Sequence, residues 1–341
     1  GLAGSLSAYG YTQEVVPSFI DVDLGGRIRG SMETTSVDIF PLNLAYVKPL
    51  GESLGMFHGL GLSLVLPDYH QFDGALDVPS GDLLFELRAR LQQQWETYWL
   101  VGGWGACYQG WLCVGAGPTF ALHLEEELTI LTTFAEYSDE STRDTAQTHK
   151  SDMTAAAVGG HAGFQVMPAE GFWLGATVRS PVTTLYGDGN LLDVLAVVDT
   201  LKEEASYLDR VEVADPQVDF RSPWRFGFGV GYDRPGEFSI GADVRLYLAQ
   251  EEYRTLAGPN GESFMFPSTP SGTVMDANRA VYVARTVETE TTANFSLGAE
   301  VGVSESLVVQ GGGFTDLTST PKERVRLHED NRLSRVGGTF G

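Results

Sequence analysis

The side chains best suited to bind a ligand in this 341-residue chain are three arginines in its second half. Arg179, Arg225 and Arg245 stand in segments where apolar and small residues alternate, so each guanidinium is expected opposite the apolar face. A guanidinium binds a carboxylate through two parallel hydrogen bonds. The three could therefore hold the acidic head of an amphiphilic ligand. They could equally pair with inward carboxylates such as Asp243 and Glu300.

Other polar groups add to this site without suggesting catalysis. His123 and His161 are expected on the same inward face, and we add His161 to the candidate ligand-binding residues. A single histidine without a second nearby ligand makes a weak metal site, so no metal is expected. Ser180-Pro181 and Ser222-Pro223 are typical of turns and lack the flanking glycines of a nucleophile elbow. We expect a protein without catalytic residues or cofactor, and not an enzyme.

The only two cysteines, Cys107 and Cys113, lie in the run WGACYQGWLCVG. A tight turn over Tyr108–Gly110 would bring their side chains close enough for a disulfide, which an oxidising compartment favours. The alternative is a pair of unbridged apolar thiols. Two cysteines at this spacing lack the further ligands of a structural metal site.

Composition limits the classes of protein to which the chain can belong. With 22 basic and 45 acidic residues the net charge is −23, so a nucleic-acid partner is not expected. Forty-one of the 341 residues are glycine, well above the typical fraction of roughly 7%. No apolar run reaches the ~18–20 residues of a membrane-spanning helix. Because glycine weakens helices and is spread through apolar segments, the chain is predicted to be all-β.

Strict two-residue alternation shows which way these strands would face. The runs 224–232, 238–248 and 293–303 put large apolar residues on one face and mainly glycine and small polar residues on the other. A soluble sandwich also alternates, but its polar face would carry more Lys, Glu and Thr. A membrane barrel explains the glycine-rich face and the Trp and Tyr residues near the ends of the apolar faces. The residues predicted to face lipid include Phe226, Phe228, Ile240, Val244 and Leu297.

Twelve strands are predicted in one domain over residues 1–341, a transmembrane antiparallel β-barrel of a bacterial outer membrane. Short turns alternate with long connections, as periplasmic turns alternate with extracellular loops in such barrels. The long connections are predicted around 21–35, 67–83, 132–151, 182–218, 251–281 and 317–330. The predicted strands lie near 5–20, 36–48, 56–66, 84–106, 111–131, 152–167, 171–181, 219–232, 237–250, 282–303, 306–316 and 331–341.

Three segments resemble the long-chain fatty acid transporter (FadL-like) family of outer-membrane proteins. They are GFWLGATVRSP at Gly171–Pro181, the hairpin Ser222–Tyr247, and Leu307–Phe340 with its proline-bearing connection. The resemblance implies a 14-stranded barrel, an N-terminal hatch in the lumen and passage of hydrophobic molecules. Gly1-Leu2-Ala3-Gly4 resembles the end of the run that follows the hatch. We therefore expect the hatch and the last two strands to lie outside this chain.

The resemblance also implies a place where a ligand could leave sideways. In that family a kink in the third strand opens the wall to the bilayer. Here the third predicted strand carries Gly59 and Gly61 and ends at Pro67, residues that permit a kink. The alternative is an ordinary strand end at a loop.

Two functions remain open at this stage. The first is an outer-membrane channel for passive uptake of hydrophobic small molecules such as long-chain fatty acids. The alternative is an outer-membrane scaffold or partner subunit of a larger surface or secretion complex, with a protein bound to acidic loops at 182–218 and 251–281. Both place the protein among membrane lipids. A lumen free to hold a ligand favours the first, and a lumen filled by side chains favours the second.

Overall fold

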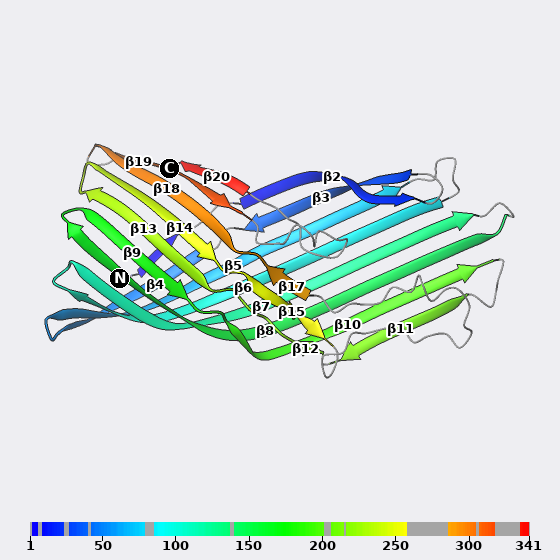
Figure 1. The fold of residues 1–341 in the computed structure, drawn as a ribbon, viewed down its shortest axis with the longest axis horizontal. Helices are drawn as coiled ribbons and strands as arrows, with labels where there is room; N and C mark the ends of the chain where they lie inside the picture. Colours follow the sequence, from blue (N-terminus) through cyan, green and yellow to red (C-terminus); the bar gives the residue numbers. More distant parts are fainter. Residues whose placement is uncertain are drawn as a thin grey trace.

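A computed structural model gives the fold of the chain (Figure 1). It describes residues 2–5, 9–23, 27–39, 42–78, 85–136, 140–200, 206–214, 216–257, 286–304, 307–317 and 335–340. Within these ranges every regular element is a β-strand, and no helix has the length and apolar character needed to cross a membrane.

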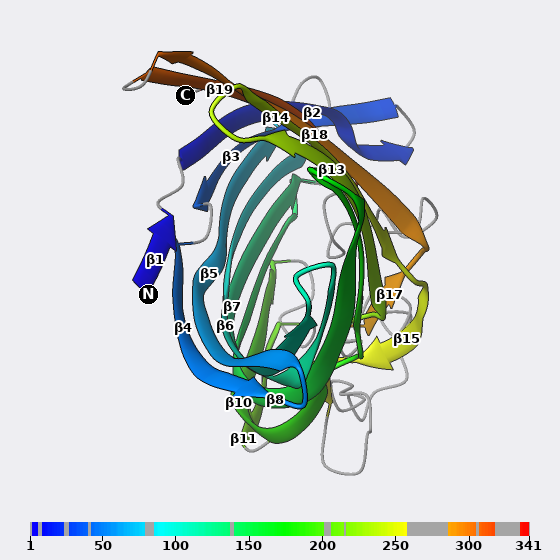
Figure 2. The ribbon, with the colours of Figure 1, turned by 90° about the vertical axis from the view of Figure 1, so that its left-hand side faces the viewer.

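The wall is one large sheet that curls into a barrel, seen end-on in Figure 2. Twelve strands form its main path, and every neighbouring pair is antiparallel. The predicted all-β membrane-barrel class is confirmed. The path runs β1 (Leu2–Ser5), β4 (Leu42–Ser53), β5 (Met56–Val78), β6 (Phe85–Tyr108), β7 (Leu112–Glu136), β8 (Thr142–Ala169), β9 (Phe172–Arg179), β13 (Arg225–Arg234), β14 (Phe238–Tyr247), β18 (Thr292–Ser304), β19 (Leu307–Asp316) and β20 (Arg335–Phe340).

Four further strands lengthen the wall at the end opposite the short turns, on the right in Figure 1. β8 pairs with β9 along one half and with β10 (Thr183–Asp199) along the other, and β10 pairs with β11 (Tyr207–Ala214). In the same way β2 (Tyr9–Asp23) and β3 (Arg27–Ile39) form a hairpin that joins the far half of β5. The long loops predicted at 21–35, 67–83, 132–151 and 182–218 are therefore wrong, since most of each is strand and β5 continues past Pro67 to Val78.

Short turns gather at the other end, as predicted. They join β4 to β5, β6 to β7, β8 to β9 and β13 to β14, on the left in Figure 1. Glycines occupy the left-handed positions in these turns, among them Gly110 with φ of 75° and Gly236 with φ of 77°. In outer-membrane barrels this end faces the periplasm.

The outer face of the wall is apolar and open to its surroundings. Phe228 is 55% exposed, Ile240 45% and Leu297 57%, although each is a large hydrophobic side chain. Phe226 and Val244 on the same faces are partly exposed. Such a face is stable against lipid and costly against water, so these strands cross a membrane and the predicted lipid-facing residues are confirmed.

A small inner layer lies against the inner face of the wall. β12 (Gln217–Val218) pairs with β16 (Leu256–Ala257), and their side chains pack on Met153, Ala155 and Leu191. A Cβ on Gly187 of β10 would lie 2.6 Å from the Cβ of Val218, so a glycine is required where this layer passes. Beside it β15 (Gln250–Arg254) pairs with β17 (Thr286–Thr289). The best-buried apolar residues lie between this layer and the wall.

Candidate ligand cavity in the barrel

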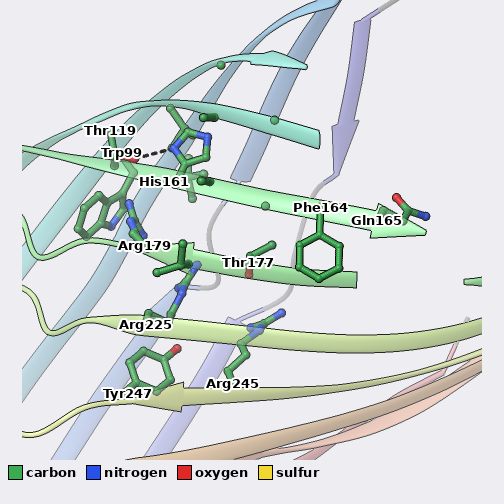
Figure 3. Close-up of a pocket in the computed structure, with 18 of the residues that line it drawn as sticks. Trp99, Thr119, His161, Phe164, Gln165, Thr177, Arg179, Arg225, Arg245 and Tyr247 are labelled. Carbon is green, nitrogen blue, oxygen red and sulfur yellow. Dashed lines mark hydrogen bonds between the residues drawn. The ribbon is translucent and has the colours of Figure 1, made fainter. Parts of the chain in front are cut away.

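A cavity of about 1110 Å³ lies in the lumen, lined by strands from opposite walls. The lining strands are β5 to β9, β13, β14, β18 and β19, which follow one another around the curved sheet. All four predicted ligand-binding residues line it: Arg179, Arg225, Arg245 and His161 (Figure 3). The two-residue alternation predicted correctly that these side chains point into the lumen. They come from segments far apart in the sequence.

Three of these residues share a single row across the wall. His161 of β8 pairs with Arg179 of β9, which pairs with Arg225 of β13, and Arg225 pairs with Tyr247 of β14. Arg245 lies one step away, opposite Gly227. Two like charges directly opposite each other in a sheet destabilise it. The Arg179–Arg225 pair therefore places two positive charges opposite each other in the wall.

Aromatic rings offset part of this repulsion. The guanidinium carbon of Arg179 lies 3.9 Å from the centre of the Trp99 ring, and that of Arg225 lies 6.0 Å from the Tyr247 ring. A cation over an aromatic face is worth about 0.5–2 kcal/mol, more when it is out of water. The sequence analysis missed both rings, although the alternation in β6 that sets Trp99 inward was visible.

No carboxylate among the described residues forms an ion pair with Arg179, Arg225 or Arg245. Asp243, the expected neutraliser, instead accepts a hydrogen bond from Ser296 over 3.4 Å. The Nη2 atom of Arg179 is buried and has no hydrogen-bond partner in the described part of the chain. Burying such a donor without a partner is costly, so it favours an incoming acceptor.

The rest of the cavity wall is largely apolar or bare backbone. Val65, Val101 and Trp99 line it together with Gly103, Gly115 and Gly163. His161 is held by a 3.1 Å hydrogen bond between its Nδ1 and the hydroxyl of Thr119. A ligand with one anionic end and an apolar body fits this distribution. Within the described residues, no cluster of three metal-ligating side chains is present.

The predicted disulfide is formed. Cys107 and Cys113 are direct cross-strand partners at the β6–β7 turn, with Cα atoms 4.0 Å apart. Cys113 also lines the cavity. The bond therefore fastens the turn at the short-turn end of the lumen.

The third predicted strand is β5, and its irregularity lies where Pro67 was expected to cause one. Gly59 and Gly61 pair regularly with Gly105 and Gly103 of β6. The register then shifts between Val65 and Asp68, so Leu66 and Pro67 form a bulge. The bulge agrees with the predicted kink. Whether it opens the wall is a matter for the proposed function.

A second irregularity, which the sequence analysis missed, interrupts the wall between β6 and β7. Val101 pairs with Thr119 and Trp104 with Ala116, which leaves Gly102, Gly103, Gly117 and Pro118 outside the ladder. A Cβ on Gly117 would overlap the carbonyl oxygen of Gly102. A groove of about 540 Å³ lies on the wall here and shares Gly103, Trp104 and Ala116 with the lining of the cavity. Only backbone separates the two spaces at these glycines.

The apolar outer belt and the ligand-sized lumen define a membrane-spanning β-barrel of the bacterial outer-membrane type. No protein-family model matches the chain, and no curated protein matches it. Among solved structures, the toluene transporter TodX of Pseudomonas putida is 12% identical, with 92% of this chain and 73% of that chain covered and a TM-score of 0.47. The monoaromatic hydrocarbon channel CymD is 12% identical, with coverages of 85% and 75% and a TM-score of 0.40.

These two channels belong to the family that the three sequence segments resemble. A third solved structure, the copper transporter OprC, is 10% identical, with coverages of 99% and 78% and a TM-score of 0.21. At such identities and TM-scores below 0.5, the function has to be argued from the side chains in the lumen.

Proposed function

We propose that this protein is an outer-membrane channel for passive uptake of hydrophobic small molecules with an acidic head, such as long-chain fatty acids. The carrying observation is the cavity itself, in which Arg179, Arg225 and Arg245 line an apolar and glycine-rich wall and form no ion pair with a carboxylate of the described residues. A carboxylate bound there would satisfy the buried Nη2 of Arg179. The ligand's tail would lie along Val65, Val101 and the glycine backbone.

The volume of the cavity supports a ligand of this kind. At about 1110 Å³ it is near the upper end of the roughly 300–1,000 Å³ typical of small-molecule sites. Toluene and monoaromatic hydrocarbons, named for the similar solved structures, are small and neutral and need no cation. The row of arginines is the feature that favours an acid over a hydrocarbon in this chain.

The exit into the bilayer belongs to the same proposal. The bulge at Leu66-Pro67, together with Gly59 and Gly61 of β5, is the proposed lateral opening. A bulge removes ladder hydrogen bonds locally, and proline cannot donate one, so the wall is weakened there. The unpaired glycines between β6 and β7 weaken the neighbouring strand pair as well.

One observation favours the alternative, a scaffold or partner subunit of a larger complex. β11 pairs only with β10 in the described part of the sheet, so its other edge could accept a strand from a partner protein. Charged residues such as Arg210 and Glu212 lie on that strand, and they discourage unspecific pairing. The cavity does not require this function, so we place it second.

Binding of palmitate by the detergent-solubilised protein tests the main proposal. The double variant Arg225→Ala and Arg245→Ala should bind at least ten-fold more weakly than wild type. Arg234→Ala is the matched control, since Arg234 is exposed and paired with Glu237 over 3.1 Å outside the cavity. Equal affinity in wild type and the double variant would remove the arginines from the site. Uptake of toluene without palmitate binding would show a hydrocarbon channel, and absence of both would favour the scaffold.

A further inference from the structure

The lumen cavity ends abruptly on the side of the strand extensions. Along the inward face of β7, Cys113, Gly115 and Thr119 line the cavity. Thr119 is itself fully buried, and the next inward residues, Ala121 and His123, are only 4% and 7% exposed. Something therefore covers the wall from Thr119 onward.

The cover comes from residues 216–223, which we call the inner segment. Phe220 of this segment, together with Trp99, packs on the buried cluster of Ala121, Ala157 and Val182. The Phe220 ring also stacks on the His123 ring, with centroids 4.3 Å apart and planes inclined by 12°. The His123 ring is itself held by a 2.9 Å hydrogen bond between its Nδ1 and the hydroxyl of Thr97.

The same ring cluster touches the ligand site. Trp99 packs on the cluster that Phe220 covers. The centre of its ring also lies 3.9 Å from the guanidinium carbon of Arg179. Phe220 thus lies at the end of the cavity nearest to the extensions, one residue layer from the proposed head-group site.

The inner segment is attached far more weakly than a wall strand. Thr184 holds Phe220, because its hydroxyl accepts from the Phe220 N–H at 2.6 Å and lies 3.1 Å from the Phe220 carbonyl oxygen. Val182 N–H donates to the Ser222 hydroxyl at 3.1 Å, and Asp219 N–H donates to the Thr255 carbonyl at 2.9 Å. The Tyr253 hydroxyl accepts from the Arg221 N–H at 3.4 Å and donates to the Arg221 carbonyl oxygen at 3.2 Å. These bonds do not form a long ladder, whereas β7 and β8 pair without a break from Leu112–Val166 to Glu136–Thr142.

We propose that the inner segment is an internal gate and that Phe220 is its specificity-determining side chain. The gate separates the cavity from the extended end of the barrel, and a hydrophobic molecule enters by displacing Phe220 from His123 and Trp99. Small polar solutes cannot replace those ring contacts and are excluded. The inference rests on the proposed uptake function for its direction of transport, but the barrier itself does not depend on the ligand's identity.

Conductance of the full chain in planar bilayers, in potassium chloride, tests the gate. Phe220→Ala should raise the single-channel conductance at least three-fold and admit arabinose in a liposome-swelling assay. Phe220→Leu, which keeps an apolar side chain over the cluster, should stay near wild type. Phe228→Ala is the matched control, because Phe228 is 55% exposed on the outer face.

A second variant decides the matter if Phe220→Ala does not fold, as judged by heat-dependent gel migration. Thr184→Val removes the hydroxyl that holds the Phe220 backbone and should also raise conductance. The gate is overturned if Phe220→Ala folds but keeps the wild-type conductance and admits no arabinose. If Phe220→Ala does not fold, the gate is overturned when Thr184→Val leaves the conductance unchanged. Raised conductance without palmitate binding would leave the gate standing and refute the proposed substrate, so the two failures are distinguishable.

Discussion

Replacing Arg179 by methionine is expected to make the barrel more stable and the binding of an acid weaker. Methionine keeps an unbranched apolar side chain and removes the guanidinium. The substitution removes the buried, unpartnered Nη2, worth about 1–3 kcal/mol, and the like-charge opposition to Arg225, worth roughly 0.2–1 kcal/mol. It loses the cation–π contact with Trp99, about 0.5–2 kcal/mol. The expected net gain is about 1 kcal/mol.

The effect on ligand affinity has the opposite sign. A hydrogen bond to a charged group contributes about 1.5–3 kcal/mol. At about 1.4 kcal/mol per factor of ten, the Arg179→Met variant should bind palmitate roughly 10- to 150-fold more weakly. A residue that lowers stability and raises affinity is typical of a binding site, and a purely structural arginine would do neither.

Two measurements check that the variant is more stable and binds palmitate more weakly. Urea unfolding in vesicles, followed by gel migration, gives the free energy of unfolding, and calorimetry with palmitate gives the dissociation constant. Arg234→Met removes an exposed ion pair and should change the free energy of unfolding and the dissociation constant only slightly. The reasoning is refuted if Arg179→Met destabilises the barrel by more than 1 kcal/mol and leaves the affinity unchanged, since Arg179 would then be held for structure alone.

Three further predictions follow from the wall. Phe228→Arg should lower the free energy of unfolding by roughly 2–4 kcal/mol if this exposed site lies near the middle of the membrane. A change below 0.5 kcal/mol in the same urea assay would contradict the assignment of Phe228 to the lipid-facing side. Cys107 and Cys113 should resist alkylation without reductant, and two labelled thiols by mass spectrometry would contradict the bond. Replacing both by serine should lower the free energy of unfolding by about 2 kcal/mol, since the closed loop is short. Gly117→Val should weaken the β6–β7 pair enough to lower the folded yield. Gly231→Val should be tolerated, because its Cβ would lie 3.6 Å from the carbonyl oxygen of Ile240, an ordinary contact distance.

The facing of the strands could be predicted from the sequence, because a strand's side chains alternate with a period of two. That rule, together with the glycine-rich polar faces typical of a membrane barrel, set Arg179, Arg225 and Arg245 inward and Phe228 and Leu297 outward. The short turns could also be predicted, and glycine permits the left-handed backbone that they contain. These properties depend on neighbouring residues only, so one sequence is sufficient to predict them.

Register between distant strands could not be predicted in the same way. Arg179 and Arg225 are direct partners, yet 45 positions lie between them and the intervening chain makes its own hairpin and inner layer. The segment Leu191–Val197 carries apolar residues at nearly every position, so its alternation is hidden and the stretch was taken for a loop. In the structure Leu191, Asp193, Leu195 and Val197 are buried on one face of β10.

The inner segment was also misassigned, and the reason is instructive. A wall strand was predicted from 219, but β13 begins at Arg225. Pro223 cannot donate a ladder hydrogen bond, which favours a strand start after it. Phe220 has the same alternation phase as Trp224 and Phe226, and alternation cannot tell the outer face of a strand from a segment folded inward.

The wall and the inner segment are held in different ways, and the proposed gate depends on this difference. A continuous ladder opens only when many adjacent hydrogen bonds break together, so the wall contributes the high-stability part of the fold. The inner segment packs Val218 and Phe220 on buried residues of the wall, but its hydrogen bonds come from single side chains and one two-pair sheet. A segment without a long ladder opens at a lower free energy than the wall. In the proposed gate, opening at Thr184 gives a ligand access to Arg179 while the barrel wall stays intact.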